Sequence, residues 1–581
     1  MKNLLDLPVL VILPILELLD CDALYNCALV CKSLSKYAND QLWRNVPRLD
    51  SLLAVLSPLV VRKVKNQHNE VGQKVKVFAH PPTEADVKHF VPHANRVRRI
   101  AYMEEDVEAP VFTTRIARQS FTRLQQLFPR PILPNLTHLA WMTSPGHNSQ
   151  LLKFSKMFLH ENMISLAIGP VLDGEVLEDI LSLVPNLEGL ILHSSIPVEE
   201  VEESLYTALE GLTRLEEIAL PRFWYTEQVM ATLSEKRYLR EIHCSYDDHE
   251  GQMGSDPEEV ASYELSFEQG AFPALRQLHV DLSLSNVLPA LESARAPAKL
   301  EGLSVRTLDI ESQESMATFF KIASTSFSLL TSLSLTVRDS LGLELDLAAD
   351  DAADEATEAT ADLFRPALDL RHIKSFTLSY SRPLCVWNHD LEDIPDRWPD
   401  LEHFELNPRP KYLRAHSHLT LDAVRIFTRC KNIKFLGLHL DARVDVTGSS
   451  LFTQPKFEPG LTDLDLGCSA GGTVSQEVMF FSYILPAGCK IKWGVAPGDE
   501  EDDYSTAMDV LWNATDNTVS MWILNNMSWS MLVAGLRSTL DEMETKNNKL
   551  ESENRKLRAN QKKLKEQNQR LREIGPIALL D

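Results

Sequence analysis

Residues 187–220 read LEGLILHSSIPVEEVEESLYTALEGLTRLEEIAL, and this stretch decides the fold. It begins and ends with the same pattern, apolar-x-x-apolar-x-apolar, at residues 187–192 and 215–220. Between the two copies, apolar residues from Val201 to Leu212 recur at the three-to-four spacing of a half-buried helix. The stretch therefore predicts a strand, a helix and a second strand.

The same pattern occurs thirteen times along the chain, at intervals of 24 to 43 residues. The copies begin at Val97, Leu136, Met163, Leu187, Leu215, Leu239, Leu275, Leu300, Leu330, Ile373, Leu401, Ile433 and Leu461. A strand-and-helix unit repeated about every thirty residues is typical of a leucine-rich-repeat solenoid. The sequence therefore predicts an α/β fold with such a solenoid over residues 97–495.

Leucine-rich repeats commonly carry an asparagine after each strand, where it hydrogen-bonds the turn backbone. Seven units here have another small polar residue at that position: Ser144, Ser195, Asp247, Ser283, Ser381, Asp441 and Ser469. The other units have unsuited residues, so we expect an irregular solenoid. The alternative is that the strands belong to some other α/β fold, because the repeated pattern is common in protein cores.

The N-terminus contains a second informative stretch. Pro8, shortly after Asp6, is a helix-start signal, and apolar residues follow at every third position from Leu10 to Leu19. Asp22 is expected to cap a second helix, whose apolar face runs from Leu24 through Leu34. Helices this short bury too little surface to be stable alone, so they gain from docking on a partner.

The spacing from Leu7-Pro8 through Val30-Cys31-Lys32 to Leu42-Trp43 resembles an F-box. F-boxes dock proteins onto the Skp-type adaptor of a cullin-RING ubiquitin ligase. The resemblance implies a helical domain over residues 4–46, with these adaptor-binding residues: Leu7, Pro8, Ile15, Leu16, Leu19, Leu24, Val30, Cys31, Leu42 and Trp43.

Two positions depart from the F-box pattern. Leu10 stands where the family often has a glutamate, and Pro14 falls inside the first helix, where it deletes a hydrogen bond and predicts a short or bent helix. The alternative is a secretory signal, since Lys2 precedes an apolar run. Asp6, Glu17 and the absence of a small-residue cleavage site argue against it.

Composition limits the class of protein and the compartment that are to be expected. The chain has 581 residues, 44% of them hydrophobic and 24% charged, and a formal charge of −24, which argues against nonspecific nucleic-acid binding. Its eight cysteines are too few and too scattered for a disulfide scaffold, and no C-x-x-C occurs for a zinc or RING site. No apolar run reaches the length of a membrane span. These features predict a cytoplasmic or nuclear protein without a metal or cofactor.

Polar stretches divide the rest of the chain. Residues 47–96 are expected to be a linker with helical parts, and residues 339–362, rich in aspartate and glutamate, an insertion loop. The alternative is that this acidic insert binds a basic partner protein. The run Asp-Glu-Glu-Asp-Asp at 499–503 closes the repeats and opens an acidic linker with an apolar tail over residues 496–535.

A heptad pattern over residues 536–573 predicts a coiled coil. Its seam consists of Leu536, Met543, Leu550, Leu557, Leu564 and Leu571. Polar residues such as Asn547 and Asn554 at the preceding a positions favour a parallel dimer of defined register at some cost in stability. The alternative is a single solvated helix, or one folded back on the solenoid.

One stretch of the sequence resembles a catalytic motif. Residues 467–471 form a G-x-S-x-G between a strand and a plausible helix, which is the context of a serine hydrolase. No histidine follows His439, however, and Ser469 already has a structural explanation. We therefore predict no catalytic residue. The F-box resemblance implies a non-catalytic substrate receptor, and the runner-up is an F-box-bearing scaffold that does not mark its partner for degradation.

Neighbouring repeats suggest where a protein client could bind. The units at Leu239 and Leu275 place Arg240 beside Arg276 and His243 beside His279, which predicts a small basic column. One interpretation is a pocket in which the arginines bind a carboxylate or phosphate of the client. The other is that nearby glutamates, Glu216, Glu217 and Glu301, merely neutralise the arginines.

Overall fold

A computed structural model describes most of the chain up to residue 492. The described residues are 8–64, 73–104, 115–128, 131–143, 149–221, 223–244, 264–307, 311–337, 359–410, 417–442, 455–469, 480–481, 483–486 and 488–492. The coiled coil predicted at 536–573, the linker 496–535 with its acidic run, Leu7, and residues 339–358 of the acidic insert lie outside them. The chain divides into two compact units, one up to Ser332 with 337–343, the other comprising 333–336 and residues from 344.

The first unit begins with three short helices, α1 (Val9–Glu17), α2 (Cys21–Val30) and α3 (Lys32–Leu42). Their core consists of Ile12, Leu16, Leu24 and Leu34. Helix α1 continues through Pro14 but is only nine residues long, in line with the expected short helix.

The sequence prediction for the second helix was wrong in two respects. Asp20, not Asp22, caps α2: its carboxylate accepts a hydrogen bond from the N–H of Ala23 at 2.7 Å, whereas Asp22 already lies in the first helical turn. The predicted single helix is also two helices. Cys31 adopts an extended conformation between them, and its sulfur accepts a hydrogen bond from the N–H of Leu34 at 3.5 Å.

Nine parallel strands of the first unit pair in chain order. They are β1 (Asn45–Val46), β4 (Arg99–Met103), β5 (His138–Met142), β6 (Ser165–Gly169), β7 (Gly189–Leu192), β8 (Glu217–Leu220), β9 (Glu241–Cys244), β10 (Gln277–Asp281) and β11 (Gly302–Thr307). The sheet thus begins one strand before the first predicted repeat. Between β1 and β4 the chain forms an antiparallel pair, β2 (Leu59–Val64) and β3 (Gln73–Phe78).

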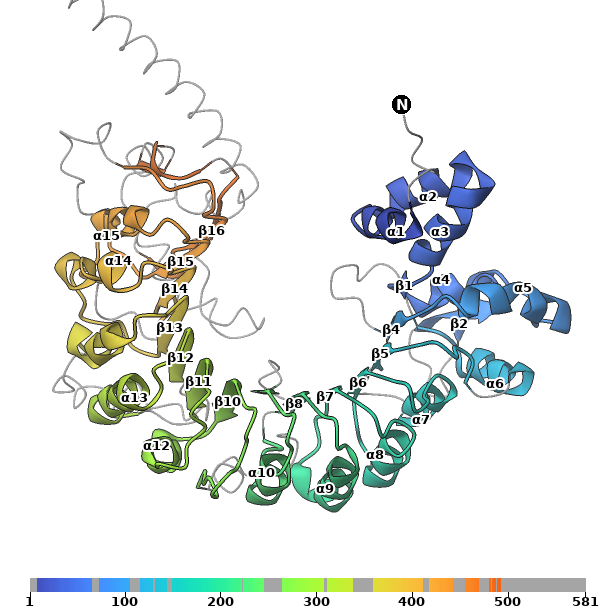
Figure 1. The fold of residues 1–581 in the computed structure, drawn as a ribbon, viewed down its shortest axis with the longest axis horizontal. Coiled ribbons are helices and arrows are strands. Elements are labelled where there is room, and N and C mark those ends of the chain that lie inside the picture. The colour runs from blue at the N-terminus through green and yellow to red at the C-terminus, as the bar shows by residue number, and fades with distance from the viewer. Residues whose placement is uncertain are drawn as a thin grey trace, which may run out of the picture. The chain divides into compact units, whose positions relative to one another are not determined.

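Helices follow most of these strands. They are α4 (Leu49–Leu53), α5 (Glu84–Ala94), α6 (Arg118–Leu127), α7 (Ser149–Leu152), α8 (Gly174–Leu181), α9 (Glu202–Gly211), α10 (Glu227–Ser234), α12 (Leu284–Glu292) and α13 (Gln313–Ser326). Helices α8, α9 and α10 lie side by side along one face of the sheet (Figure 1), as the apolar spacing predicted for α8 and α9. No described helix has both the length and the apolar character that crossing a membrane requires.

The second unit contains another run of parallel strands. In order these are β13 (Ser375–Tyr380), β14 (His403–Leu406), β15 (Phe435–Leu438), β16 (Asp463–Asp465) and β17 (Lys490–Lys492), while β12 (Ser332–Val337) lies at the division of the units. Its helices are α14 (Ile394–Arg397) and α15 (Leu421–Ile426), with 3-10 turns at Ala361–Leu363, Arg365–Asp369, Asn388–Leu391 and Phe427–Arg429. Its core contains an aromatic cluster around Phe376.

The predicted leucine-rich-repeat pattern is confirmed. Each of the thirteen strands from β4 to β16 begins two residues after the first apolar residue of its unit. Those first residues are at most 2% exposed, because they point from the turn before the strand into the core. The fold is therefore α/β, with parallel strands and intervening helices as the pattern predicted.

Polar residues after the strands bond the turn backbone, but not always at the expected offset. Ser469 does so as predicted: its hydroxyl accepts a hydrogen bond from Leu440 N–H at 2.8 Å and donates one to the Leu438 carbonyl at 3.3 Å. Ser194, rather than the predicted Ser195, donates to the Val171 carbonyl. The number of residues between the strand and this polar residue varies between units, so the fixed spacing used for the prediction pointed to Ser195 instead.

One asparagine ladder residue was missed. Asn407 is buried after β14, where its side chain accepts a hydrogen bond from Tyr380 N–H at 2.9 Å and donates one to the Arg382 carbonyl at 2.7 Å. It adopts a positive φ of 48°, which asparagine tolerates better than most residues. It stands two positions earlier than the offset used for the prediction.

Candidate functional site

The N-terminal helices expose an unusual amount of apolar surface. Among the described residues, eight of the sixteen large hydrophobic side chains that are exposed lie between residues 9 and 30: Val9, Leu10, Val11, Ile15, Leu18, Tyr25, Leu29 and Val30. We call this set the N-terminal apolar face. An exposed apolar surface of this kind marks an interaction site.

The ten predicted adaptor-binding residues fall into two groups. Pro8, Ile15 and Val30 are exposed, and Val30 is 72% accessible. The others within the described chain are core residues: Leu16 and Leu24 are buried, and Leu19, Cys31 and Leu42 pack against them. Trp43 is half-buried. Core members can support docking only by holding the helices together.

Three exposed leucines that the sequence reasoning did not assign to the interface belong to the N-terminal apolar face. Leu10, Leu18 and Leu29 are 84%, 88% and 68% exposed. Leu10 was noted only as a departure from the family pattern. The helical period of 3.6 would have found Leu10, because the leucines spaced exactly three apart from Leu10 to Leu19 drift around the helix and cannot all face one core.

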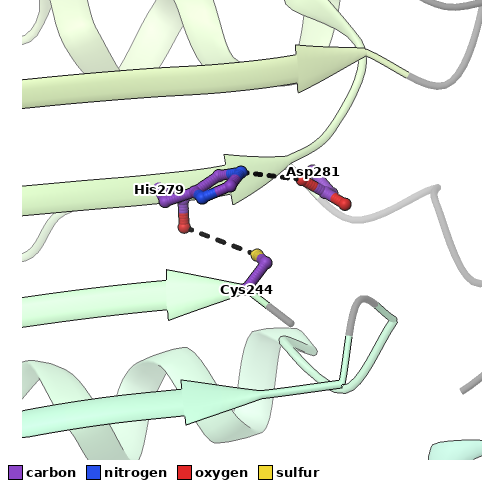
Figure 2. Close-up of side chains that lie close together, drawn as sticks. All are labelled: Cys244, His279 and Asp281. Atoms are coloured by element: carbon purple, nitrogen blue, oxygen red, sulfur yellow. Dashed lines mark hydrogen bonds and ion pairs between the residues drawn. The ribbon is translucent and has the colours of Figure 1, made fainter. Parts of the chain in front are cut away.

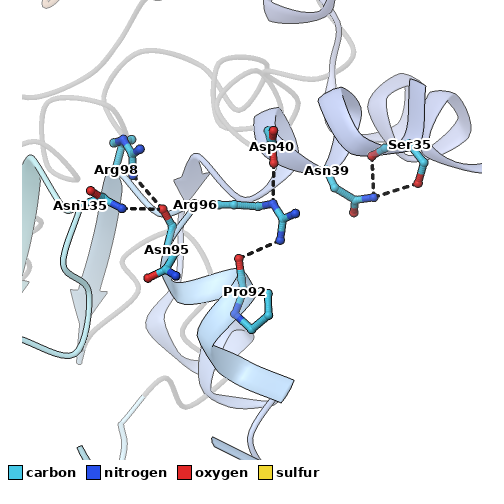
Figure 3. A network of polar contacts seen from close by, with 8 residues as sticks. All are labelled: Ser35, Asn39, Asp40, Pro92, Asn95, Arg96, Arg98 and Asn135. Carbon is cyan, nitrogen blue, oxygen red and sulfur yellow. Dashed lines mark hydrogen bonds and ion pairs between the residues drawn. The ribbon is translucent and has the colours of Figure 1, made fainter. Parts of the chain in front are cut away.

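Side chains connect α3 and the residue that follows it to α5 and to the turn after α5. Figure 3 shows Arg96, whose Nε lies 2.5 Å from Asp40 Oδ1 on α3 and whose Nη1 donates to the Pro92 carbonyl at 2.7 Å. The Trp43 ring contacts the His93 ring edge-on at 4.5 Å between centroids. These contacts brace α3 against α5 without using the exposed leucines.

The backbone reinforces this connection. The Arg44 carbonyl accepts hydrogen bonds from the N–H groups of Arg98 and Arg99 at 2.8 and 3.0 Å, so α3 leads directly into the sheet through β1. The Asn95 carbonyl accepts hydrogen bonds from Asn135 and Arg98 (Figure 3). The N-terminal apolar face therefore rests on a braced support.

A second candidate surface lies on strands β8 to β11. Strand pairing aligns Gln277 with Glu241, and the N–H of Arg276 donates to the Arg240 carbonyl at 2.8 Å. This register places the backbones of His243 and His279 next to each other. Arg240 therefore stands beside Arg276, and His243 beside His279, as expected for the basic column.

Each basic side chain of this column contacts a carboxylate. Arg240 lies 3.3 Å from Glu216, and Arg276 pairs with Glu301. His243 lies 3.0 Å from Glu241, and His279 lies 3.3 Å from Asp281. The two arginine side chains are about half exposed, so each pair contributes less than about 1 kcal/mol. The geometry is that of neutralised pairs, and client binding by these four residues stays a prediction.

Reversing both arginine charges tests that prediction. Arg240→Glu with Arg276→Glu should lower the free energy of unfolding only slightly, because exposed ion pairs contribute so little. If the column binds clients, a specific subset of partners should be lost in affinity purification while adaptor binding persists. An unaltered partner list would show that the column is only surface.

Two groups of side chains in the same strands have metal-ligating chemistry. Cys244, His279 and Asp281 bring their ligand atoms within 4.8 Å of one another, and so do Glu217, Glu241 and His243. The first group is largely buried and combines sulfur, nitrogen and oxygen. The second is partly exposed and consists mainly of carboxylates, which commonly occur without a metal.

The hydrolase alternative finds no support at Ser469. Its hydroxyl is buried and makes hydrogen bonds to the backbone on both sides of β15's end. A nucleophile must be presented to a substrate and activated by a base. Ser469 serves as a ladder residue of the repeat instead.

Comparisons with known proteins identify the N-terminal module. The F-box-like family model matches residues 4–47. A search of curated proteins gave no match. The N-terminal module is therefore an F-box-like domain, and the repeats that follow have the leucine-rich-repeat fold.

Solved structures with similar folds include a chain of the yeast Rad7 and Elc1 complex. The similarity covers 80% of this chain and 98% of that one, at 15% identity and a TM-score of 0.40. The leucine-rich-repeat-containing protein LegL7 from Legionella pneumophila matches over 51% of this chain and 88% of its own, at 15% identity and a TM-score of 0.29.

Proposed function

We propose that this chain, an F-box-like domain followed by leucine-rich repeats, is a non-catalytic substrate receptor of an SCF-type ubiquitin ligase. The F-box-like domain docks the Skp-type adaptor and, through it, the cullin, while the repeats bind the client protein. A separate enzyme transfers ubiquitin. The observation that carries the proposal is the F-box-like match to the same helices that expose the N-terminal apolar face.

The physical argument for docking is that this face needs a partner. Leu10, Leu18 and Leu29 contribute almost nothing to the domain's own core, so their burial free energy is available to an interface. Burying a large aliphatic side chain is worth about 1.5–3 kcal/mol. A few such residues on braced helices suffice for a specific protein contact.

The repeats suit the receptor half of the role. In the first unit, side chains on alternate positions of each strand point away from the core, and equivalent positions of adjacent strands stand side by side. Such a surface can bind an extended area of a folded client. It requires no catalytic residue, which fits the structural use of Ser469.

We place this activity in the cytoplasm or nucleus. All eight cysteines are free thiols, which supports a reducing compartment. Homodimerisation through residues 536–573 remains a further proposal that rests on the heptad pattern alone.

The rate of client degradation distinguishes a receptor from a scaffold. Proximity labelling by the full chain under proteasome inhibition should identify proteins bound by the repeats. When the N-terminal apolar face is disrupted, those proteins should stay labelled but their half-lives should lengthen severalfold. Unchanged half-lives would favour the scaffold.

A further inference from the structure

Three metal-ligating side chains meet at the ends of β9 and β10. Cys244 is the last residue of β9, while His279 and Asp281 stand two positions apart on β10, so their side chains leave the strand on the same side. Figure 2 shows the three side chains gathered at one place, with the imidazole of His279 beside the carboxylate of Asp281 and the thiol of Cys244 directed at the His279 carbonyl. Strand pairing alone brings Cys244 to residues more than thirty positions away.

The distances suit a zinc ion. Nε2 of His279 lies 3.3 Å from Oδ1 of Asp281. Two ligands that are each about 2.0–2.1 Å from a tetrahedral zinc lie about 3.3–3.4 Å apart. The same nitrogen is buried and makes no hydrogen bond to any residue in the described part of the chain. A cation between the two atoms would coordinate both.

The thiol needs a small adjustment. It now donates a weak hydrogen bond to the His279 carbonyl at 3.7 Å, so it already lies over β10. A sulfur and a nitrogen bound to one zinc are about 3.6 Å apart, compared with the 4.8 Å within which all three ligand atoms lie. Loss of the thiol proton, with a rotation of the Cys244 side chain that moves its sulfur by about an ångström, would complete the site.

A neighbouring arginine orients the carboxylate. Arg306 on β11 donates from Nε to Oδ2 of Asp281 at 2.9 Å, and its Nη2 contacts the same oxygen. This leaves Oδ1 directed at His279. Ligating carboxylates are typically held in this way by a hydrogen-bond donor outside the coordination shell. The Asp281 side chain is fully buried and that of Arg306 nearly so, which limits competition from water.

We infer that Cys244, His279 and Asp281 bind a zinc ion, with a fourth position open to water or to a group of a bound partner. Sulfur, nitrogen and oxygen donors together are the set that zinc accepts, and three protein ligands with one open position is a common zinc geometry. The thiolate and the carboxylate bring two negative charges to the ion, and the Arg306 guanidinium beside Asp281 leaves the site with one net positive charge. This inference goes beyond the proposed function and does not depend on it.

Cobalt(II) provides a direct probe, because it replaces zinc and gives a thiolate-to-metal charge-transfer absorption. The full chain, stripped with a chelator, should bind one cobalt ion with this absorption and lose it when zinc is added. Cys244→Ser should abolish the band. His279→Asn should weaken binding by more than about 100-fold, since loss of an outer-shell partner alone typically costs 10–100-fold.

Two matched variants serve as controls, one for the other thiols and one for the second group of possible ligands, Glu217, Glu241 and His243. Burial raises the pKa of Cys430 to about 12, so this thiol is a poor ligand and Cys430→Ser should leave the band unchanged. His243→Asn removes the imidazole of that second group and should also leave the absorption band unchanged.

Circular dichroism of each variant checks folding, and His279→Asn gives the test if Cys244→Ser does not fold. A folded full chain without charge-transfer absorption would overturn the inference. So would an equal band in folded Cys244→Ser, or unchanged cobalt affinity in folded His279→Asn, because other cysteines would then be the ligands.

Discussion

Replacing both Leu18 and Leu29 by lysine should weaken binding of the Skp-type adaptor by at least about a hundredfold. Each substitution removes an apolar side chain whose burial is worth about 1.5–3 kcal/mol, and two such losses correspond to that factor or more. Each also places a charge where the interface would exclude water, which adds to the cost.

The same two substitutions should leave the F-box-like domain folded. Leu18 is 88% and Leu29 68% exposed, so neither supports the core of Ile12, Leu16 and Leu24. Lysine at the C-terminal ends of α1 and α2 agrees with the helix dipole. Calorimetric titration with purified adaptor measures the affinity, and circular dichroism checks the fold.

A matched control is available on the repeats. Leu329 is also an exposed leucine, at 50%, so Leu329→Lys makes a comparable chemical change away from the F-box-like domain. It should leave adaptor affinity unchanged. Undiminished binding by the folded double variant would mean that the adaptor uses a different surface.

The second large effect is expected in the core of the second unit. Phe376→Ala should lower the free energy of unfolding of this unit by about 3–5 kcal/mol, because it opens a cavity at a fully buried site. The Phe376 ring packs against Phe364, Trp398 and Phe404, with centroids 6.0, 5.1 and 5.7 Å away. Urea unfolding followed by tryptophan fluorescence measures the loss.

Phe435→Ala is the control for this substitution. The Phe435 ring is half-buried and stacks on His403 at 4.3 Å, so its removal should cost only about 0.5–1.5 kcal/mol beyond a small loss of burial. An equal cost for both substitutions would show that the aromatic cluster around Phe376 is not the centre of the unit's core.

The repeat fold was predictable because each strand has its own signal. Leu187, Leu190 and Leu192 are all fully buried, and the same three positions recur in every unit, so strand positions could be read from the pattern. The two-residue strand β1 has no such pattern and was missed. The ladder residues Ser194 and Asn407 were missed because the turn length after the strand varies between units.

The candidate sites were less predictable. Family spacing located the F-box-like domain, but the division between buried Leu16 and exposed Leu10 depends on how three helices pack together. The zinc ligands Cys244 and His279 have no motif spacing, since the register of β9 against β10 brings them together. A search for paired cysteines therefore predicted no metal site.

The central claim, that this chain joins a cullin-RING ligase through its F-box-like domain, is tested most directly by reconstitution. Purified full chain, Skp-type adaptor and cullin are mixed and separated by size-exclusion chromatography, in parallel with the Leu18→Lys, Leu29→Lys variant. The account predicts that the full chain co-elutes with adaptor and cullin and that the variant elutes alone. Separate elution of the unmodified chain, or co-elution of the variant to the same extent, would contradict it.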